Sequence, residues 1–295
     1  PLGRKLNEEE LADMIEDVDV LIAGTEPISK KVLNRANRLK LISRVGIGLD
    51  SVNLVKAREL GIAISYTPDA PAPAVAELTI GLMLSLLRSI HVANSELHTG
   101  IWHRHFGRRI PEITIGVIGA GRIGGRVLRR LAAFGSPRIL INDIDPVSDV
   151  TDKLKLEWVD KDTIYREADV ITLHVPLTKK TKNMIGYSEL KKMKPDACII
   201  NASRGGIVNE TDLERVLHEG HLSGAAIDVF ENEPYIGGLS KIERCLLTSH
   251  MGSMSVDCRT KMEIEATEEV VRFFKKEPLQ GLVPTTEYDN QKESV

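Results

Sequence analysis

A glycine-rich turn that follows an apolar run constrains this sequence most. Residues 113–118 are apolar and rich in β-branched side chains, which favours a buried strand. Gly119, Gly121 and Gly124 follow with the spacing GxGxxG, and residues 122–131 carry apolar side chains at helical spacing. A strand, a glycine turn and an amphipathic helix in this order predict the start of a dinucleotide-binding βαβ unit.

The chemistry of each position supports this interpretation. Gly119 permits a tight turn, Gly121 lets a pyrophosphate approach the backbone, and Gly124 lets the helix pack close to the strand. The apolar run 139–141 leads to Asp143, nineteen positions after Gly124, where an acid would bind the ribose hydroxyls. An acid there repels a 2′-phosphate, so the sequence predicts NAD rather than NADP as cofactor. The alternative is a glycine turn in an α/β protein that binds no ligand.

The bulk composition limits the class of protein. A chain of 295 residues with 42% hydrophobic residues has enough material for two globular domains. The net charge of −3 argues against a nucleic-acid-binding protein. The three widely spaced cysteines favour a reducing compartment, so we expect a cytoplasmic protein. The apolar run 78–87 is too short to span a bilayer, and we see no signal peptide.

The first seventy residues alternate between short strands and helices. We predict strands over 18–23, 39–43 and 62–66, helices over 29–36 and 54–60, and a helix that Asn7 caps. Prolines at 68, 71 and 73 then indicate a change of domain.

The rest of the chain continues the alternation. We expect one long helix from Val75 to about His98, then six strands from Ile113 onward in a doubly wound sheet. A long final helix over 255–275 can return to the first unit, and the polar tail after Pro278 is predicted to be frayed. The expected fold is α/β with two Rossmann-like parallel-sheet domains. The predicted boundaries are 1–72 plus 262–295 for a discontinuous substrate domain and 73–261 for an NAD-binding domain.

Three charged residues follow three successive predicted strands, at the edge of the sheet where ligands bind. Arg204 suits a substrate carboxylate, because a guanidinium can grip it in a forked pair. His250 can give a proton to a ketone oxygen near neutral pH, and Glu233 can hold its tautomer. This set suits hydride transfer to a 2-oxo acid. The structural alternative is a salt bridge for Arg204, a turn cap for Glu233 and a core position for His250.

Three histidines, His98, His103 and His105, lie close together. Their spacing fits no standard ligand set, and the sequence shows no acid or cysteine that joins them. We therefore expect no metal site.

The chain resembles the D-isomer-specific 2-hydroxyacid dehydrogenases, and their phosphoglycerate dehydrogenase-like branch most closely. The resemblance covers nearly the whole chain and rests on RVGIGLDSVN (44–53), AVAELTIGLML (74–84), VIGAGRIG (117–124), HVPLT (174–178), INASRGGIVNE (200–210), AAIDVFENEP (225–234) and LLTSHMGS (246–253). It implies that Arg204 binds substrate, Glu233 pairs with the histidine, and His250 donates and accepts the proton.

The resemblance also implies further contacts. Besides the three glycines and Asp143, it places these residues on the cofactor: Arg122, Ile123, His174, Val175, Pro176, Ala202 and Asp228. It places Arg44, Val45 and Gly46 on the substrate, with Arg44 matching an arginine that meets phosphate in phosphoglycerate dehydrogenases. Arg104 and Arg108 are expected near the substrate. The implied partners are a small 2-hydroxy or 2-oxo acid and a second copy of the chain, which would bind through the cofactor domain to form a homodimer.

Some features depart from the family pattern. Ser249 stands where relatives commonly have proline, and Asn209 replaces a common aspartate. The first strand and helix of the substrate domain are expected to lie before Pro1. The leading hypothesis is an NAD-dependent dehydrogenase of D-2-hydroxy acids, D-3-phosphoglycerate among them. The alternatives are a corepressor-like NAD(H) sensor without turnover and a formate-dehydrogenase-type enzyme, which would lack the acid at Glu233.

Overall fold

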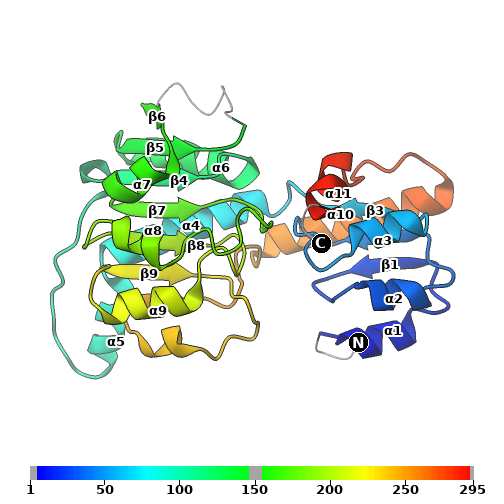
Figure 1. The fold of residues 1–295 in the computed structure, drawn as a ribbon, viewed down its shortest axis with the longest axis horizontal. Helices are drawn as coiled ribbons and strands as arrows, with labels where there is room; N and C mark the ends of the chain where they lie inside the picture. Colours follow the sequence, from blue (N-terminus) through cyan, green and yellow to red (C-terminus); the bar gives the residue numbers. More distant parts are fainter. Residues whose placement is uncertain (1–4, 146–154, 293–295) are drawn as a thin grey trace. The chain divides into compact units, whose positions relative to one another are not determined.

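The computed structural model describes residues 5–145 and 155–292. The chain forms two compact units, one of Pro1–Pro71 with Met254–Val295 and one of Ala72–Ser253, here called unit 1 and unit 2. Each unit is built on its own parallel sheet with helices packed on it (Figure 1).

Unit 1 holds a three-stranded parallel sheet in the order β1-β2-β3. Its elements are α1 (Glu8–Met14), β1 (Val20–Ala23), α2 (Lys30–Arg35), β2 (Leu41–Arg44), α3 (Leu54–Glu59), β3 (Ala63–Tyr66), α10 (Val256–Lys275) and α11 (Thr285–Lys292). The predicted cap at Asn7 is present, because its side chain accepts a backbone N–H at the start of α1. The side chains of Ser29 and Asn53 cap α2 and α3 in the same way. Local sequence therefore determines where these short helices begin.

Helix α10 packs against this sheet, as the sequence predicted for the last helix. The Ser43 hydroxyl on β2 donates to the Ala266 carbonyl on α10 at 2.8 Å. Residues from both ends of the described chain therefore make one core, and the domain is discontinuous in sequence.

The prediction of a frayed polar tail is wrong for the described residues after Pro278, although 293–295 lie outside them. Val283 and Tyr288 are buried, and residues 285–292 form α11. The Gln291 side chain accepts from the Leu54 backbone N–H at 2.6 Å and donates to the Val52 carbonyl at 2.8 Å. These contacts hold α11 against the start of α3.

Unit 2 holds a seven-stranded parallel sheet in the order β10-β9-β8-β7-β4-β5-β6. Its strands are β4 (Thr114–Ile118), β5 (Arg138–Asn142), β6 (Leu156–Trp158), β7 (Val170–Leu173), β8 (Cys198–Asn201), β9 (Gly224–Ile227) and β10 (Cys245–Leu247). Its helices are α4 (Ala72–Leu87), α5 (Ile90–His98), α6 (Arg122–Leu131), α7 (Lys161–Glu167), α8 (Tyr187–Lys192) and α9 (Glu210–His218), with short 3-10 turns at Ile110–Glu112, Ala132–Phe134 and Gly238–Lys241. Strand order reverses at β4, as in a doubly wound sheet.

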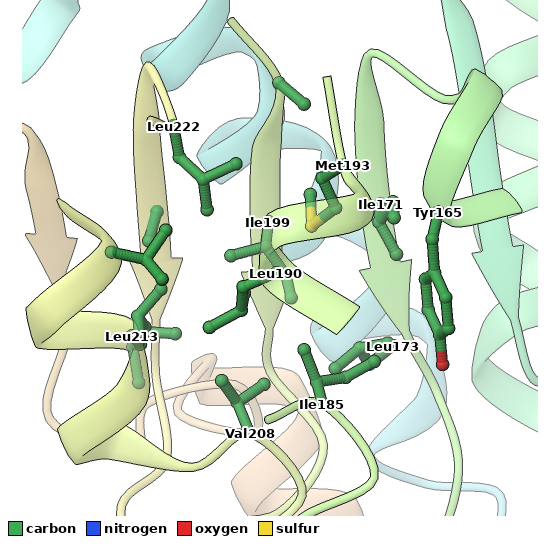
Figure 2. Close-up of a cluster of buried hydrophobic side chains, with 14 of the residues drawn as sticks. Tyr165, Ile171, Leu173, Ile185, Leu190, Met193, Ile199, Val208, Leu213 and Leu222 are labelled. Atoms are coloured by element: carbon green, nitrogen blue, oxygen red, sulfur yellow. The ribbon is translucent and has the colours of Figure 1, made fainter. Parts of the chain in front are cut away.

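Alternate residues of the strands enter two separate cores, one on each face. On β8, Ile200 packs with α4 and α6, whereas its neighbour Ile199 packs with α7, α8 and α9. Figure 2 shows the second core, where Ile171 and Ile199 from the sheet lie beside Leu190 and Leu213 from the helices. A sheet buried on both faces explains why its strands are continuously apolar.

The structure corrects two expectations in unit 2. The sheet has seven strands among the described residues, whereas six were predicted. The additional strand is the short, largely exposed edge strand β6, which lacks the apolar pattern from which strands were predicted. The single helix expected from Val75 to His98 is two helices, α4 and α5, bent by 64°. Ser89 between them is left-handed with φ 50°, and the Leu87 carbonyl accepts from the Arg108 backbone N–H at 3.1 Å instead of continuing the helix.

Among the described residues, no single helix has the length and apolar character needed to cross a membrane. Helices α4 and α5 meet that criterion only when they are counted together across their bend.

Candidate active site

The glycine turn between β4 and α6 has the geometry that nucleotide binding requires. Gly119 has φ 96°, and a Cβ on it would meet the His174 carbonyl at 2.5 Å. A Cβ on Gly124 would lie 1.9 Å from the Gly119 carbonyl oxygen. By contrast, beyond its chain neighbours, no described atom lies within 4 Å of the position that a Cβ on Gly121 would take. Two glycines are therefore enforced by the protein itself, whereas the space at Gly121 is open to a ligand.

Gly121 is also the N-cap of α6, and its lack of a side chain leaves the first-turn N–H groups without a side-chain cap. Those groups and the helix dipole attract phosphate. Arg122 and Ile123, both predicted pyrophosphate contacts, occupy the first turn, and Arg122 is exposed.

Asp143 lies just after β5, at the same end of the sheet as the glycine turn. Its Oδ2 accepts the Ala120 backbone N–H at 2.5 Å, and its Oδ1 accepts the Asp145 N–H at 3.0 Å. The carboxylate is thus fixed beside the loop, where its charge disfavours a 2′-phosphate.

His174 follows β7 and packs behind the glycine turn. Its Nε2 shares a hydrogen bond with the Thr172 hydroxyl at 3.0 Å, and its Nδ1 is buried without a hydrogen-bond partner among the described residues. Burial lowers the pKa of this imidazole to about 4, so the ring is neutral at physiological pH. A neutral ring with a buried orphan nitrogen, on a residue that is half-buried as a whole, fits the wall of a ligand site.

These features fit NAD. The open face at Gly121, the uncapped start of α6, the acid at Asp143 and the orphan nitrogen of His174 lie around one turn. The residues that would hold the pyrophosphate and the adenosine ribose are therefore present.

Glu233 and His250 form the central pair of the predicted catalytic residues. The imidazole Nδ1 of His250 lies 2.9 Å from Glu233 Oε2 and 3.0 Å from Oε1. Glu233 Oε1 also accepts the Phe230 backbone N–H at 3.1 Å, which fixes the carboxylate in place. Both side chains are more than a third exposed, so the pair is accessible to a substrate.

The buried residue Asp228 holds the loop that carries His250. Its Oδ1 accepts the Thr248 hydroxyl at 2.5 Å and the Met251 N–H at 2.9 Å, and its Oδ2 accepts the Gly252 N–H at 3.0 Å. The His250 N–H donates to the Asp228 carbonyl at 2.7 Å, and His250 itself is left-handed with φ 51°. One carboxylate thus maintains a strained loop conformation, and that conformation directs the imidazole.

Arg204 lies on the loop that follows β8, and β8 pairs with β9 in the sheet. The Asn201 side-chain amide donates to the Arg204 carbonyl at 2.9 Å, and Arg204 Nη1 donates to the Ser203 carbonyl at 2.6 Å. A Cβ on Gly205 would lie 2.0 Å from the Phe230 carbonyl, so this loop packs backbone to backbone against the loop that carries Glu233. The three predicted residues therefore come from adjoining loops, and a direct contact joins Glu233 and His250.

Comparisons with known proteins decide the family. The family model described as D-isomer specific 2-hydroxyacid dehydrogenase, NAD binding domain, matches residues 80–252, more than half of the chain. The chain belongs to this family. It is an NAD-dependent oxidoreductase of D-2-hydroxy acids, and the sensor alternative is not favoured.

Individual members of the D-2-hydroxyacid dehydrogenase family resemble the chain over most of its length. A hydroxypyruvate reductase of Thermotoga maritima is 36% identical, over 90% of this chain and 88% of that protein. A D-3-phosphoglycerate dehydrogenase of Methanocaldococcus jannaschii is 37% identical over 94% of this chain, which spans only 54% of that relative. A solved D-lactate dehydrogenase of Aquifex aeolicus, complexed with NAD and lactic acid, has a TM-score of 0.85 and 25% identity, over 92% of this chain and 87% of that one.

Other cofactor contacts expected for this dehydrogenase family stay predictions. Val175 is half-buried beside the glycine turn, Ala202 is buried in the α4–α6 core, and Pro176 is exposed. The resemblance places Asp228 on the cofactor. Because both of its carboxylate oxygens are engaged within the loop, the structure gives it a positioning role as well.

The predicted substrate residues of unit 1 have partners within that unit. The Val45 N–H donates to the Ala23 carbonyl at 2.9 Å, and the Gly46 N–H donates to the Thr67 hydroxyl at 2.7 Å. Arg44 is only 6% exposed, and its side chain donates to the carbonyls of Ala23 and Val45. Contact between these groups and a substrate would require an exchange of hydrogen bonds, so it stays a prediction.

An acid that the sequence pattern did not reveal, Glu96, lies beside two of the three histidines. Glu96 Oε2 lies 2.6 Å from His105 Nε2, and Oε1 lies 3.3 Å from His103 Nδ1, whereas His98 is outside the group. The hydrogen bond with His105 lowers the pKa of Glu96. The expectation that no acid joins these histidines is therefore wrong. The signal was available as an acid seven residues before a His-x-His pair, across the end of a helix.

Proposed function

We propose that the chain reduces a small 2-oxo acid to its D-2-hydroxy acid, and catalyses the reverse oxidation, through Arg204, Glu233 and His250. The observation that carries this proposal is the hydrogen bond of 2.9 Å between His250 and Glu233 on a loop that Asp228 holds in a strained conformation. Such a pair is the arrangement that directional proton transfer needs.

Bound NADH supplies the hydride that reaches the carbonyl carbon. His250 gives its proton to the carbonyl oxygen as negative charge develops there. Because Nδ1 faces Glu233, Nε2 is the ring nitrogen that remains for this transfer. Glu233 fixes the tautomer of the His250 ring and stabilises its imidazolium, the protonated form that donates the proton during reduction. In the oxidation direction, neutral His250 takes the hydroxyl proton.

Arg204 is the proposed ligand of the substrate carboxylate. A guanidinium binds a carboxylate with two parallel hydrogen bonds, and the same charge polarises a neighbouring carbonyl. Its loop packs against the Glu233 loop at Gly205, so the cation and the acid are kept at a fixed spacing. This supports recognition of an acid group next to the reacting carbon.

The proposed substrate carries no phosphate. Arg44, the residue that resemblance assigns to a phosphate, is buried and donates to two backbone carbonyls. Hydroxypyruvate, the substrate named in the Thermotoga maritima relative, is accordingly the first acid to assay. Glyoxylate, D-lactate and 3-phosphoglycerate complete the panel. A preference for 3-phosphoglycerate that Arg44→Ala abolishes would establish the phosphorylated substrate instead.

The decisive variant is His250→Asn, compared with His218→Asn on the exposed face of α9. With hydroxypyruvate and NADH, His250→Asn should lower kcat by roughly a hundredfold or more, in line with the loss of a general acid. NADH binding, followed by its fluorescence, should persist in both variants. Wild-type protein that binds NADH but turns over no acid of the panel would be a sensor and would refute the proposed reaction.

We propose that the active protein is a homodimer formed through unit 2 and that it is cytoplasmic. Leu97, Ile101, Trp102 and Phe106 are all more than half exposed on one segment of unit 2, and large apolar side chains there suit an interface with a second copy. The three cysteines are buried free thiols, which suits a reducing compartment. Light scattering during gel filtration tests the dimer, and Trp102→Ser with Phe106→Ser should shift it to monomer.

A further inference from the structure

A carboxylate and two imidazoles converge at the end of α5, away from the glycine turn and the catalytic loops in the sequence. Glu96 lies in the last turn of the helix, and His103 and His105 lie on the segment that follows. One ligand atom from each side chain can be chosen so that all three lie within 4.8 Å of one another. The two imidazole rings are 4.1 Å apart, centre to centre.

We propose that Glu96, His103 and His105 form a binding site for one divalent transition-metal ion of the zinc type. Two imidazoles with one carboxylate are donors that Zn²⁺, Co²⁺, Ni²⁺ and Cu²⁺ accept, whereas Mg²⁺ and Ca²⁺ require mostly oxygen. Solvent can complete the coordination shell, because His103 is more than half exposed.

The distances suit such an ion. With metal–ligand bonds of about 2.1 Å, two ligands of a tetrahedral ion lie roughly 3.4 Å apart. The carboxylate oxygens of Glu96 lie 3.3 Å from His103 Nδ1 and 2.6 Å from His105 Nε2. Small rotations of the side chains therefore suffice to admit the ion. The ion would take the ring nitrogens that now face the carboxylate, and each neutral imidazole would keep its hydrogen on the other ring nitrogen.

The site is partly formed before an ion binds. The side chains of Glu96 and His105 are only 18% and 20% exposed, so water competes little with an ion for their ligand atoms. The Glu96 carbonyl accepts backbone N–H groups from Thr99 and Ile101 and the Thr99 hydroxyl, so the turn between the ligands is fixed. A preorganised backbone loses less entropy when a ligand binds.

An ion there would tie the surface segment 99–106 to α5. Trp102 and Phe106 on that segment are 81% and 105% exposed, so the site would set the conformation of a large apolar surface. The proposal does not depend on the dehydrogenase reaction, because none of the three ligands belongs to the proposed catalytic or nucleotide-binding set.

The test is a Zn²⁺ titration of chelator-treated full-length protein by calorimetry, in excess Mg²⁺. We expect one Zn²⁺ per chain, and a loss of affinity of roughly tenfold or more in His105→Asn and in Glu96→Gln. His98→Asn, at an exposed histidine on the same helix, is the matched control and should bind like wild type. His250→Asn removes a histidine–carboxylate pair outside this cluster and should leave the stoichiometry unchanged.

Co²⁺ gives a second measurement, because its visible absorption reports on nitrogen and oxygen ligands in a low-symmetry shell. The band should appear in wild type and His98→Asn and be absent in His103→Asn, whose exposed position makes misfolding a minor concern. A failure of the protein to bind Zn²⁺ at Zn²⁺ concentrations of roughly tens of micromolar would overturn the proposal. So would binding that His105→Asn and Glu96→Gln leave intact in variants with wild-type circular dichroism.

Discussion

Replacing Gly121 with alanine separates nucleotide binding from stability. Beyond its chain neighbours, no described atom lies within 4 Å of the added Cβ, so the methyl group meets no steric contact there. The backbone of Gly121 has φ −67° and ψ −147°, which lies outside the α and extended regions that alanine favours, so it must adjust slightly. The free energy of unfolding should therefore fall by about 1 kcal/mol, from backbone strain alone. The methyl group would occupy the space where the pyrophosphate approaches the backbone. We expect NADH affinity to fall roughly 30-fold, about 2 kcal/mol, because the phosphates must move away from the α6 N–H groups.

Gly124→Ala, three residues later, is expected to lower stability through a steric clash, unlike Gly121→Ala. Its Cβ would lie 1.9 Å from the Gly119 carbonyl oxygen and 3.4 Å from the His174 Cβ, so α6 must move away from the turn. Overpacking of this kind costs about 1–3 kcal/mol. This variant should lose both stability and NADH affinity.

Urea unfolding followed by tryptophan fluorescence measures the first quantity, because Trp102 and Trp158, the two tryptophans of the sequence, lie in unit 2 with both glycines. NADH titration measures the second. Equal destabilisation of the two variants would refute the assignment of Gly121 to an open ligand face. Wild-type NADH affinity in Gly121→Ala would refute the proposed path of the pyrophosphate.

Three further predictions concern other groups of unit 2. Asp143→Asn should raise NADPH affinity relative to NADH by roughly tenfold, about 1.4 kcal/mol, because the repelling charge is lost; parallel titrations of the two cofactors measure it. Asp228→Asn leaves one backbone N–H of the His250 loop without its acceptor, which costs about 1–3 kcal/mol, and it should lower kcat while NADH affinity persists. Because burial lowers the pKa of His174 to about 4, unfolded protein takes up a proton first as pH falls below about 6.5, so this residue's contribution to stability is complete above that pH and is lost towards pH 4. Acidification from pH 7.5 to 5 should therefore destabilise wild type by about 2 kcal/mol more than His174→Gln in urea unfolding.

Each of these has a contrary outcome. An unchanged ratio of NADPH to NADH affinity would remove Asp143 from the ribose site. Normal kcat in Asp228→Asn would show that the loop keeps its conformation without that carboxylate. Identical acid sensitivity of wild type and His174→Gln would mean that His174 is protonated in the folded protein.

The parts of the site that the sequence predicted are those encoded by local spacing. Gly119, Gly121 and Gly124 reflect contacts within one turn, and a charged residue just after a strand reaches the same edge of a parallel sheet as its neighbours. The pairing of Glu233 with His250 follows from that rule, since their loops follow the neighbouring strands β9 and β10. Topology and spacing were sufficient there.

The features that the sequence did not reveal depend on contacts between distant segments. Helix α4 ends because the Leu87 carbonyl accepts the N–H of Arg108, twenty-one residues later. The polar composition of 285–292 hides a helix that is held by hydrogen bonds of Gln291 to residues near position 53. Likewise, Glu96 faces two histidines only because the chain turns back after α5.

The discontinuous composition of unit 1 has a consequence for the order of events during translation. Residues 72–253 leave the ribosome as one uninterrupted stretch and can fold as soon as β10 has emerged. The three strands of unit 1 emerge first, yet they lack the helix that covers β2 and the glutamine that holds α3 until about 200 further residues have been made. Residues 20–66 are therefore made before unit 2 but reach their native structure after it. Their apolar strands stay exposed for longest and are the segment that we expect a chaperone to bind.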